Sequence, residues 1–81
     1  MKVNILYFAQ LKEVSRKDRE SLEVFEGTTL NGIFQLLQSQ YGHDFFEIKS
    51  LRAAVNEEFS PLDQILKEGD TVALLPPVSG G

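Results

Sequence analysis

The chain has 81 residues, of which 42% are hydrophobic and 25% charged, and its formal net charge is −4 at pH 7. This length allows one domain with a small core, which leaves little room for the deep cavity of a self-contained enzyme. The acidic balance disfavours nucleic acid and suits a basic protein partner, while the absence of cysteine excludes disulfides, thiolate metal sites and cysteine nucleophiles.

The N-terminal segment has the alternation of a strand. Residues 2–8 predict a strand in which Val3, Ile5 and Tyr7 point to one face. This segment is too short and too alternating for a signal peptide, and no run approaches the length of a membrane span, so we expect a cytoplasmic protein. The rest of a predicted hairpin follows: a turn or helix at 9–14, a charged, solvated loop without a site at 15–20, and a second strand at 21–25.

The main helix is predicted directly after this hairpin. Thr28 or Thr29 is a suitable N-cap, and Gly42 stands where a helix would end. Between them an apolar stripe recurs at helical spacing, formed by Leu30, Ile33, Phe34, Leu37 and Tyr41. Gly32 within the helix costs up to about 1 kcal/mol relative to alanine, and one use for it would be a close approach of the helix to the sheet.

The second half of the chain predicts short elements separated by turns. These are an irregular apolar lid at 43–49, a strand at 51–55, a turn at 56–58, a single helical turn within 59–66, a tight turn at 67–70 and a last strand at 71–75. The order of elements predicts an α+β fold, a mixed sheet with one main helix packed on one face. It resembles the β-grasp, or ubiquitin-like, pattern, and that resemblance implies that the first and last strands lie parallel in the middle of the sheet.

The last six residues predict an extended tail, so that residues 1–75 form the domain and residues 76–81 the tail. Pro76 and Pro77 cannot continue a sheet ladder, because proline has no N–H. A fully extended tail would reach roughly 20 Å, and Gly80 and Gly81 could enter a slot too narrow for residues with a Cβ. Terminal glycines are more often frayed, but the Pro-Pro spacer favours a tail that presents the Gly81 carboxylate to a distant active site.

No familiar catalytic or metal-binding motif accompanies the tail. His43 is the only histidine, and a lone loop histidine is usually a surface residue. Glu57 and Glu58 are neighbours in a turn, where adjacent side chains diverge, so neither an acid/base pair nor a metal site is predicted.

The alternation of the first and last strands leaves apolar residues on the sheet face away from the helix. Leu6, Phe8 and Leu75 belong to this set. They form either an exposed patch of the kind that marks partner sites or a surface covered by residues 43–49.

Three segments give the chain a family resemblance over its whole length: residues 5–13, residues 53–56 and residues 69–81, the last of which ends in Pro-Pro-Val-Ser-Gly-Gly. They resemble the small subunits of molybdopterin synthase, the MoaD-type sulfur carriers. Lys12 and Thr71 depart from the arginine and the acidic residue common in that family, and the departures concern only details of partner contact.

The resemblance implies a sulfur carrier whose catalytic residues lie on other proteins. An E1-like adenylyltransferase would use ATP and Mg²⁺ to adenylate the Gly81 carboxylate, and a sulfur donor would convert it to a thiocarboxylate; the carrier itself would bind no cofactor. The tail, Pro76, Pro77, Val78, Ser79 and Gly80, would carry the sulfur into the large subunit of a heterotetramer. There cyclic pyranopterin monophosphate would receive two sulfurs to form the molybdopterin dithiolene.

The resemblance also leaves the partner surface and three other functions to be tested. Phe8, Phe59 and Leu75 are the candidates for the partner interface. The alternatives are a sulfur carrier for thiamine or tRNA thiolation, a ubiquitin-like modifier joined to lysines through Gly81, and an interaction domain with an idle tail.

Overall fold

One five-stranded sheet and two helices form the part of the chain that the computed structural model describes, residues 1–42 and 52–75. In chain order the elements are β1 (Lys2–Tyr7), α1 (Gln10–Ser15), β2 (Arg19–Glu23), α2 (Leu30–Tyr41), β3 (Arg52–Val55), β4 (Glu58–Phe59) and β5 (Thr71–Leu75). Within these described residues no helix is long and apolar enough to cross a membrane.

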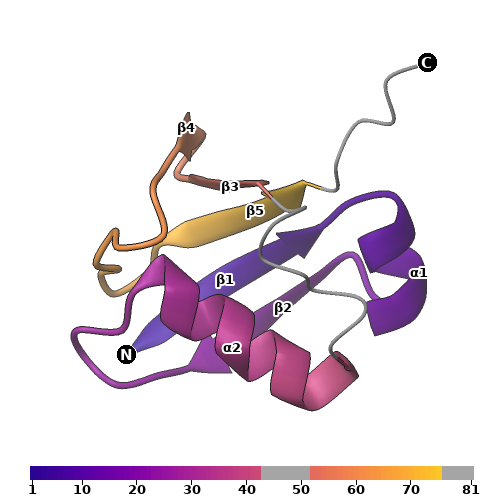
Figure 1. Cartoon of the computed structure of the whole chain (residues 1–81), viewed down its shortest axis with the longest axis horizontal. Coiled ribbons are helices and arrows are strands. Elements are labelled where there is room, and N and C mark those ends of the chain that lie inside the picture. The colour runs from indigo at the N-terminus through magenta and orange to yellow at the C-terminus, as the bar shows by residue number, and fades with distance from the viewer. Residues whose placement is uncertain (43–51, 76–81) are drawn as a thin grey trace.

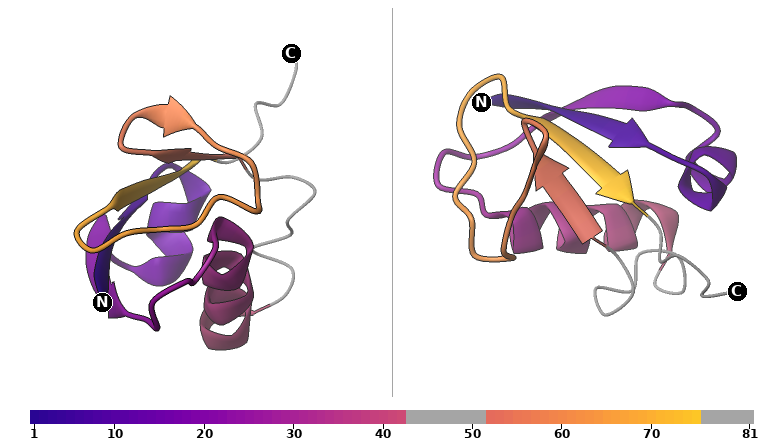
Figure 2. Two further views of the ribbon diagram at one scale, coloured as in Figure 1. Left: turned by 90° about the vertical axis from the view of Figure 1, so that its left-hand side faces the viewer. Right: turned by 90° about the horizontal axis from the view of Figure 1, so that it is seen from above.

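The sheet is mixed, with the strand order β2-β1-β5-β3-β4. β1 and β5 are parallel neighbours at its centre, and every other pair of neighbouring strands is antiparallel. α2 lies across one face of the sheet, and α1 lies at the end where β1 finishes (Figure 1, Figure 2). The predicted fold class and the parallel central pair are therefore both confirmed, whereas the predicted tail at residues 76–81 lies outside the described residues.

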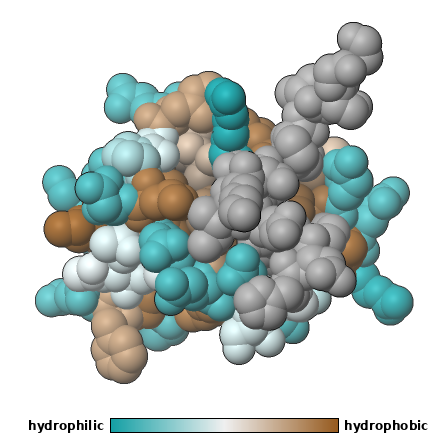
Figure 3. All heavy atoms as spheres, viewed as in Figure 1, coloured by the Kyte–Doolittle hydropathy of each residue, from teal (hydrophilic) through white to brown (hydrophobic). Residues whose placement is uncertain are grey.

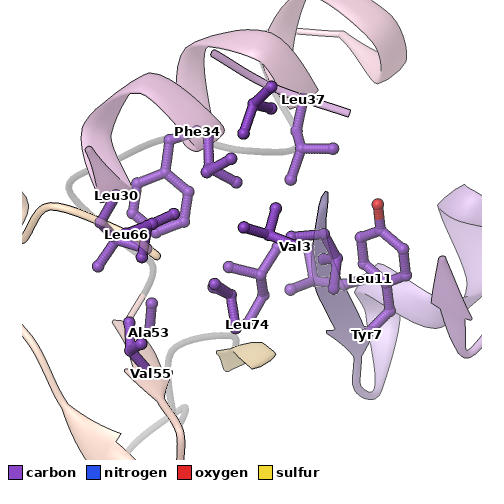
Figure 4. Packing of buried hydrophobic residues seen from close by; sticks show 14 residues of the cluster. Val3, Tyr7, Leu11, Leu30, Phe34, Leu37, Ala53, Val55, Leu66 and Leu74 are labelled. Atoms are coloured by element: carbon purple, nitrogen blue, oxygen red, sulfur yellow. The ribbon is translucent and has the colours of Figure 1, made fainter. Parts of the chain in front are cut away.

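The core lies between α2 and the sheet. Val3, Ile5 and Tyr7 are all buried, as their alternation along β1 predicts, and Val72 and Leu74 of β5 are buried beside them. The helix contributes its apolar stripe, Leu30, Ile33, Phe34 and Leu37, to the same cluster (Figure 4). Each such side chain contributes about 1.5–3 kcal/mol when fully buried, so this cluster fixes α2 on the sheet.

Both ends of α2 have the caps that the sequence predicts. The Thr29 hydroxyl accepts the Gly32 N–H at 3.2 Å, and Gly42, with φ of 111°, donates its N–H to the Gln38 carbonyl. Gly32 does not serve a close approach to the sheet, because a Cβ there would lie nearest to Thr28 Cγ2, at 3.2 Å.

The second strand begins two residues earlier than predicted. β2 runs from Arg19, which pairs with Leu6, to Glu23, which pairs with Lys2, and Phe25 lies beyond the strand with 89% of its surface exposed. The solvated loop predicted at 15–20 is therefore wrong for its last two residues. Arg19 and Glu20 join the strand although their side chains are charged, because pairing with β1 satisfies the hydrogen-bonding groups of their backbone.

The segment 59–66, for which a single helical turn is predicted, contains no helix but one hydrogen-bonded turn, in which the Gln64 N–H donates to the Pro61 carbonyl at 3.0 Å. β4 instead pairs with β3 across a turn at Asn56 and Glu57, both of which have positive φ. Downstream, the carbonyls of Leu62 and Gln64 accept N–H groups from the first turn of α2, at 2.9 Å each. The segment thus supplies acceptors for the helix N-terminus. The lid predicted at 43–49 lies outside the described residues.

Candidate functional site

The candidate reacting group is the Gly81 carboxylate, and its predicted approach residues are Pro76, Pro77, Val78, Ser79 and Gly80. All of them lie outside the described residues. The structure describes the residue that precedes this segment: Leu75, the last residue of β5, is partly exposed and pairs with Arg52 of β3.

The carboxyl ends of β1 and β5 meet at one end of the sheet, because the two strands are parallel and Tyr7 pairs with Leu74. Phe8 directly follows Tyr7 and is 43% exposed. Phe8 and Leu75, two of the predicted interface residues, therefore each follow a member of the Tyr7–Leu74 pair, Phe8 just beyond β1 and Leu75 as the last residue of β5. We call this region, with α1, Arg19 and Arg52, the carboxyl end of the sheet.

A hollow lies on the sheet face that α2 does not cover. The cross-strand register places Leu6, Ala73 and Ala54 in one row across β1, β5 and β3, and these three residues line the hollow together with Thr71, Asn56 and Glu57. The two alanines leave space beside Leu6 for a side chain of another molecule. Cover by residues 43–49 is the predicted alternative and lies outside the described residues.

Phe59, the third predicted interface residue, belongs to a different hollow. It lies on the edge strand β4, is 68% exposed, and lines a depression between α2 and β3 with Leu30, Phe34, Ala53, Pro61 and Leu62. The structure thus brings Phe8 and Leu75 to one end of the sheet and leaves Phe59 at its far edge.

Glu20 is a residue of structural importance that sequence reasoning missed. Its Oε2 accepts hydrogen bonds from the hydroxyls of Tyr7 and Tyr41, and its Oε1 lies 3.6 Å from Lys17 Nζ. Burial alone would raise the pKa of Glu20, but the two hydroxyl bonds and the Lys17 charge together outweigh it and hold that pKa below its usual value. The same burial, with the bond to Glu20, raises the pKa of Tyr7. The sequence did contain a signal for this position. Leu22 is apolar and faces the core, and Glu20, two residues earlier in the same strand, must point to the same side.

Within residues 1–42 and 52–75 no group of three or more histidine, cysteine or acidic side chains could hold a metal ion.

Comparison with known proteins identifies the chain's relatives. The model of the ThiS family matches residues 5–81. The chain belongs to the ThiS family. A molybdopterin synthase sulfur carrier subunit from Mycobacterium tuberculosis is 37% identical over 82 residues, covering 100% of this chain and 99% of the relative.

Two solved structures have folds similar to that of this chain. SAMP1 from Haloferax volcanii superposes with a TM-score of 0.83 at 26% identity and covers 100% of both chains. A chain from the complex of subunits 1 and 2 of the molybdopterin-converting factor of Helicobacter pylori superposes with a TM-score of 0.70 at 27% identity, again over 100% of both. The ThiS family match reaches Gly81, so the predicted tail falls within the matched region.

Proposed function

We propose that this chain is the sulfur carrier subunit of molybdopterin synthase and that its Gly81 carboxylate carries the sulfur. The observation that carries the proposal is the 37% identity to the Mycobacterium tuberculosis sulfur carrier subunit over essentially the whole of both chains. The fold supports it, because β5 is held at the centre of the sheet and leads directly into the tail sequence.

The chemistry follows from the weakness of a carboxylate as an electrophile. An E1-like adenylyltransferase with ATP and Mg²⁺ would join the Gly81 carboxylate to AMP and release pyrophosphate. A donor of sulfide-level sulfur would then displace AMP, leaving a C-terminal thiocarboxylate in which one sulfur replaces one oxygen. The absence of cysteine is consistent with a sulfur that is loaded onto the chain.

The proposed acceptor lies in a large subunit, in a heterotetrameric synthase within the cytoplasm. The Helicobacter pylori complex of subunits 1 and 2 supports such a partner. There the thiocarboxylate would pass sulfur to cyclic pyranopterin monophosphate in two rounds. Pro76, Pro77, Val78, Ser79 and Gly80 would form the tail that reaches the acceptor site, and Phe8 and Leu75 would lie at the edge of the contact.

The deciding experiment is the intact mass of this protein after incubation with its activating enzyme, ATP, Mg²⁺ and a sulfur donor. We expect a gain equal to one oxygen exchanged for one sulfur, localised to Gly81. An unchanged mass, with the activating enzyme active on another carrier, would reject the proposal.

A single residue added after Gly81 gives a second test. The extended variant should fold normally and lose sulfur transfer, because the reacting carboxyl is then an internal amide. A residue inserted in the exposed turn at Gly27 serves as the length control and should leave transfer unchanged. Full activity of the variant extended after Gly81 would contradict the carrier role.

A protein modifier is the second candidate, favoured by the likeness to SAMP1, whose name stands for small archaeal modifier protein 1. In this case the activated Gly81 would acylate a lysine amine of another protein. Digestion of a cell extract followed by mass spectrometry would reveal isopeptide-linked remnants of the tail if the modifier function exists.

A further inference from the structure

Charge is divided unequally between the two ends of the sheet. Among the described residues, the carboxyl end carries five basic side chains, Lys12, Arg16, Lys17, Arg19 and Arg52, against three acidic ones, Glu13, Asp18 and Glu20. The opposite end, among the described residues, carries two basic side chains, Lys2 and Lys67, against seven acidic ones that include Glu57, Glu58 and Glu68. Within residues 1–42 and 52–75, the excess of basic side chains therefore lies at the carboxyl end and the excess of acidic ones at the opposite end.

The strand topology produces this division. Arg19 starts β2 and Arg52 starts β3, and both strands run antiparallel to the central pair, so their first residues lie where β1 and β5 finish. Lys12 and Arg16 lie in and just after α1, which follows β1 at the same end (Figure 1). Hydrophilic side chains of both charge signs cover the surface on the side of α1 (Figure 3).

The cations at this end are available to a partner. Lys12, Arg16, Arg19 and Arg52 are exposed, and none of the four forms an ion pair within the described residues. Glu20, the one partly buried acid of this end, is engaged by Lys17 and the two tyrosines. Among the described residues, Glu13 and Asp18 are then the exposed acids of this end, against these four exposed cations.

Apolar side chains lie among these cations. Phe8 and Val14 are each 43% exposed, and Leu6 pairs with Arg19 across β1 and β2. An apolar centre with a charged rim is the usual anatomy of a protein–protein interface.

We propose that the carboxyl end of the sheet docks against an acidic rim around the tail-accepting site of the large subunit, while the acidic opposite end points away. This inference rests on the proposed function and names the electrostatic character of the partner surface. The inference is the opposite of the expectation drawn from the net charge of the chain, which was that an acidic carrier would bind a basic partner. A molecule with opposite charge at its two ends is oriented by its partner's electrostatic field before contact. The carboxyl end, from which the tail sequence continues, would therefore approach the large subunit first.

At physiological ionic strength, the charges at one end of the sheet have little effect on contacts made at the other end. A six-residue strand such as β1 spans about 20 Å, whereas the Debye length is about 8 Å at physiological ionic strength. A charge change at one end is therefore largely screened from a contact at the other end.

The test compares two double variants with the same net charge. Lys12→Glu/Arg16→Glu changes the carboxyl end, and Lys2→Glu/Lys67→Glu changes the opposite end; all four side chains are exposed. The measurement is the association rate constant of the full chain with its cognate large subunit, at low and at physiological salt, with circular dichroism as the folding control.

We expect the Lys12→Glu/Arg16→Glu pair to slow association by about tenfold at low salt and to weaken its salt dependence. The Lys2→Glu/Lys67→Glu pair should slow association less at low salt, where the Debye length reaches about 30 Å at 0.01 M, and should leave it unchanged at physiological salt. Equal slowing by both pairs, or faster association of the first, would overturn the inference and leave the proposed function intact. Failure of the unaltered chain to bind the large subunit would reject the proposed function itself, and the inference with it. If the reversals at 12 and 16 unfold the chain, Arg19→Glu/Arg52→Glu tests the same end.

Discussion

The Tyr41 hydroxyl donates a hydrogen bond to Glu20 Oε2 at 2.7 Å, which ties the last residue of α2 to the edge strand β2. Tyr7, from the central strand β1, donates to the same oxygen. The two rings meet edge to face, with centroids 6.2 Å apart and planes at 82°. One carboxylate thus joins the helix, the edge strand and the centre of the sheet.

Removing the Tyr7 hydroxyl tests the strength of this junction. A hydrogen bond to a charged group contributes about 1.5–3 kcal/mol, so Tyr7→Phe should lower the free energy of unfolding by that amount in urea titrations. Lys17→Ala, the matched control, removes an ion pair at 3.6 Å whose lysine side chain is 42% exposed, so solvent screening should limit its cost to less than about 1 kcal/mol. A larger loss for Lys17→Ala than for Tyr7→Phe would show that the ion pair dominates.

The same junction predicts how stability responds to acid. The pKa of Glu20 is lowered in the folded state, so its contribution is present above the unfolded-state value of about 4.3 and is lost as the pH falls through the lower, folded-state pKa. Glu20→Gln should therefore be less stable than the unaltered chain at neutral pH, and the difference should shrink as the pH falls below about 4. Glu26→Gln, at an exposed position, is the control. A difference that stays constant with pH would contradict the prediction.

Ala9 is strained, and relieving the strain should stabilise the protein. It precedes α1 with φ of 50° and ψ of −127°, a region that favours glycine. Such strain costs about 1–3 kcal/mol, and glycine loses about 0.5–1 kcal/mol in extra chain entropy. Ala9→Gly should therefore raise the urea midpoint, while Ala73→Gly in β5, without strain to relieve, should lower it. A midpoint lowered equally by both substitutions would show that Ala9 is unstrained.

Phe8 and Phe25 form a matched pair for the partner interface. Phe8 lies at the carboxyl end of the sheet, whereas Phe25 follows β2 at the opposite end and is 89% exposed. Truncating an interface aromatic costs on the order of tenfold in affinity, so Phe8→Ser should weaken binding to the large subunit by about that factor and Phe25→Ser should not. Calorimetric titration measures the affinity of each variant for the large subunit. Equal affinities for the two variants would show that Phe8 does not belong to the interface.

Much of the fold could be predicted because burial leaves a local trace in the sequence. The alternation of Val3, Ile5 and Tyr7 and the helical stripe from Leu30 to Leu37 record which side of each element meets the core. The Thr29 cap and the φ of 84° at Gly69 follow equally from residue type. The tail prediction rests on the same kind of local chemistry and stays a prediction for residues 76–81.

Only the tertiary structure decided the role of Glu20 and the charge of each end. The sequence predicts that Glu20, within a charged run, is solvated. Its hydrogen-bond partners Tyr7 and Tyr41 lie 13 and 21 residues away along the chain, so only the folded structure shows them. Arg52 likewise joins Lys12 at one end of the sheet only because β3 runs antiparallel to β5. The sequence determined the main helix and the central strands, since each of these depends on its own side chains, whereas the start of β2 and the short β4 depend on pairing. Strand register and the distribution of charge depend on pairings between distant segments, which no local pattern records.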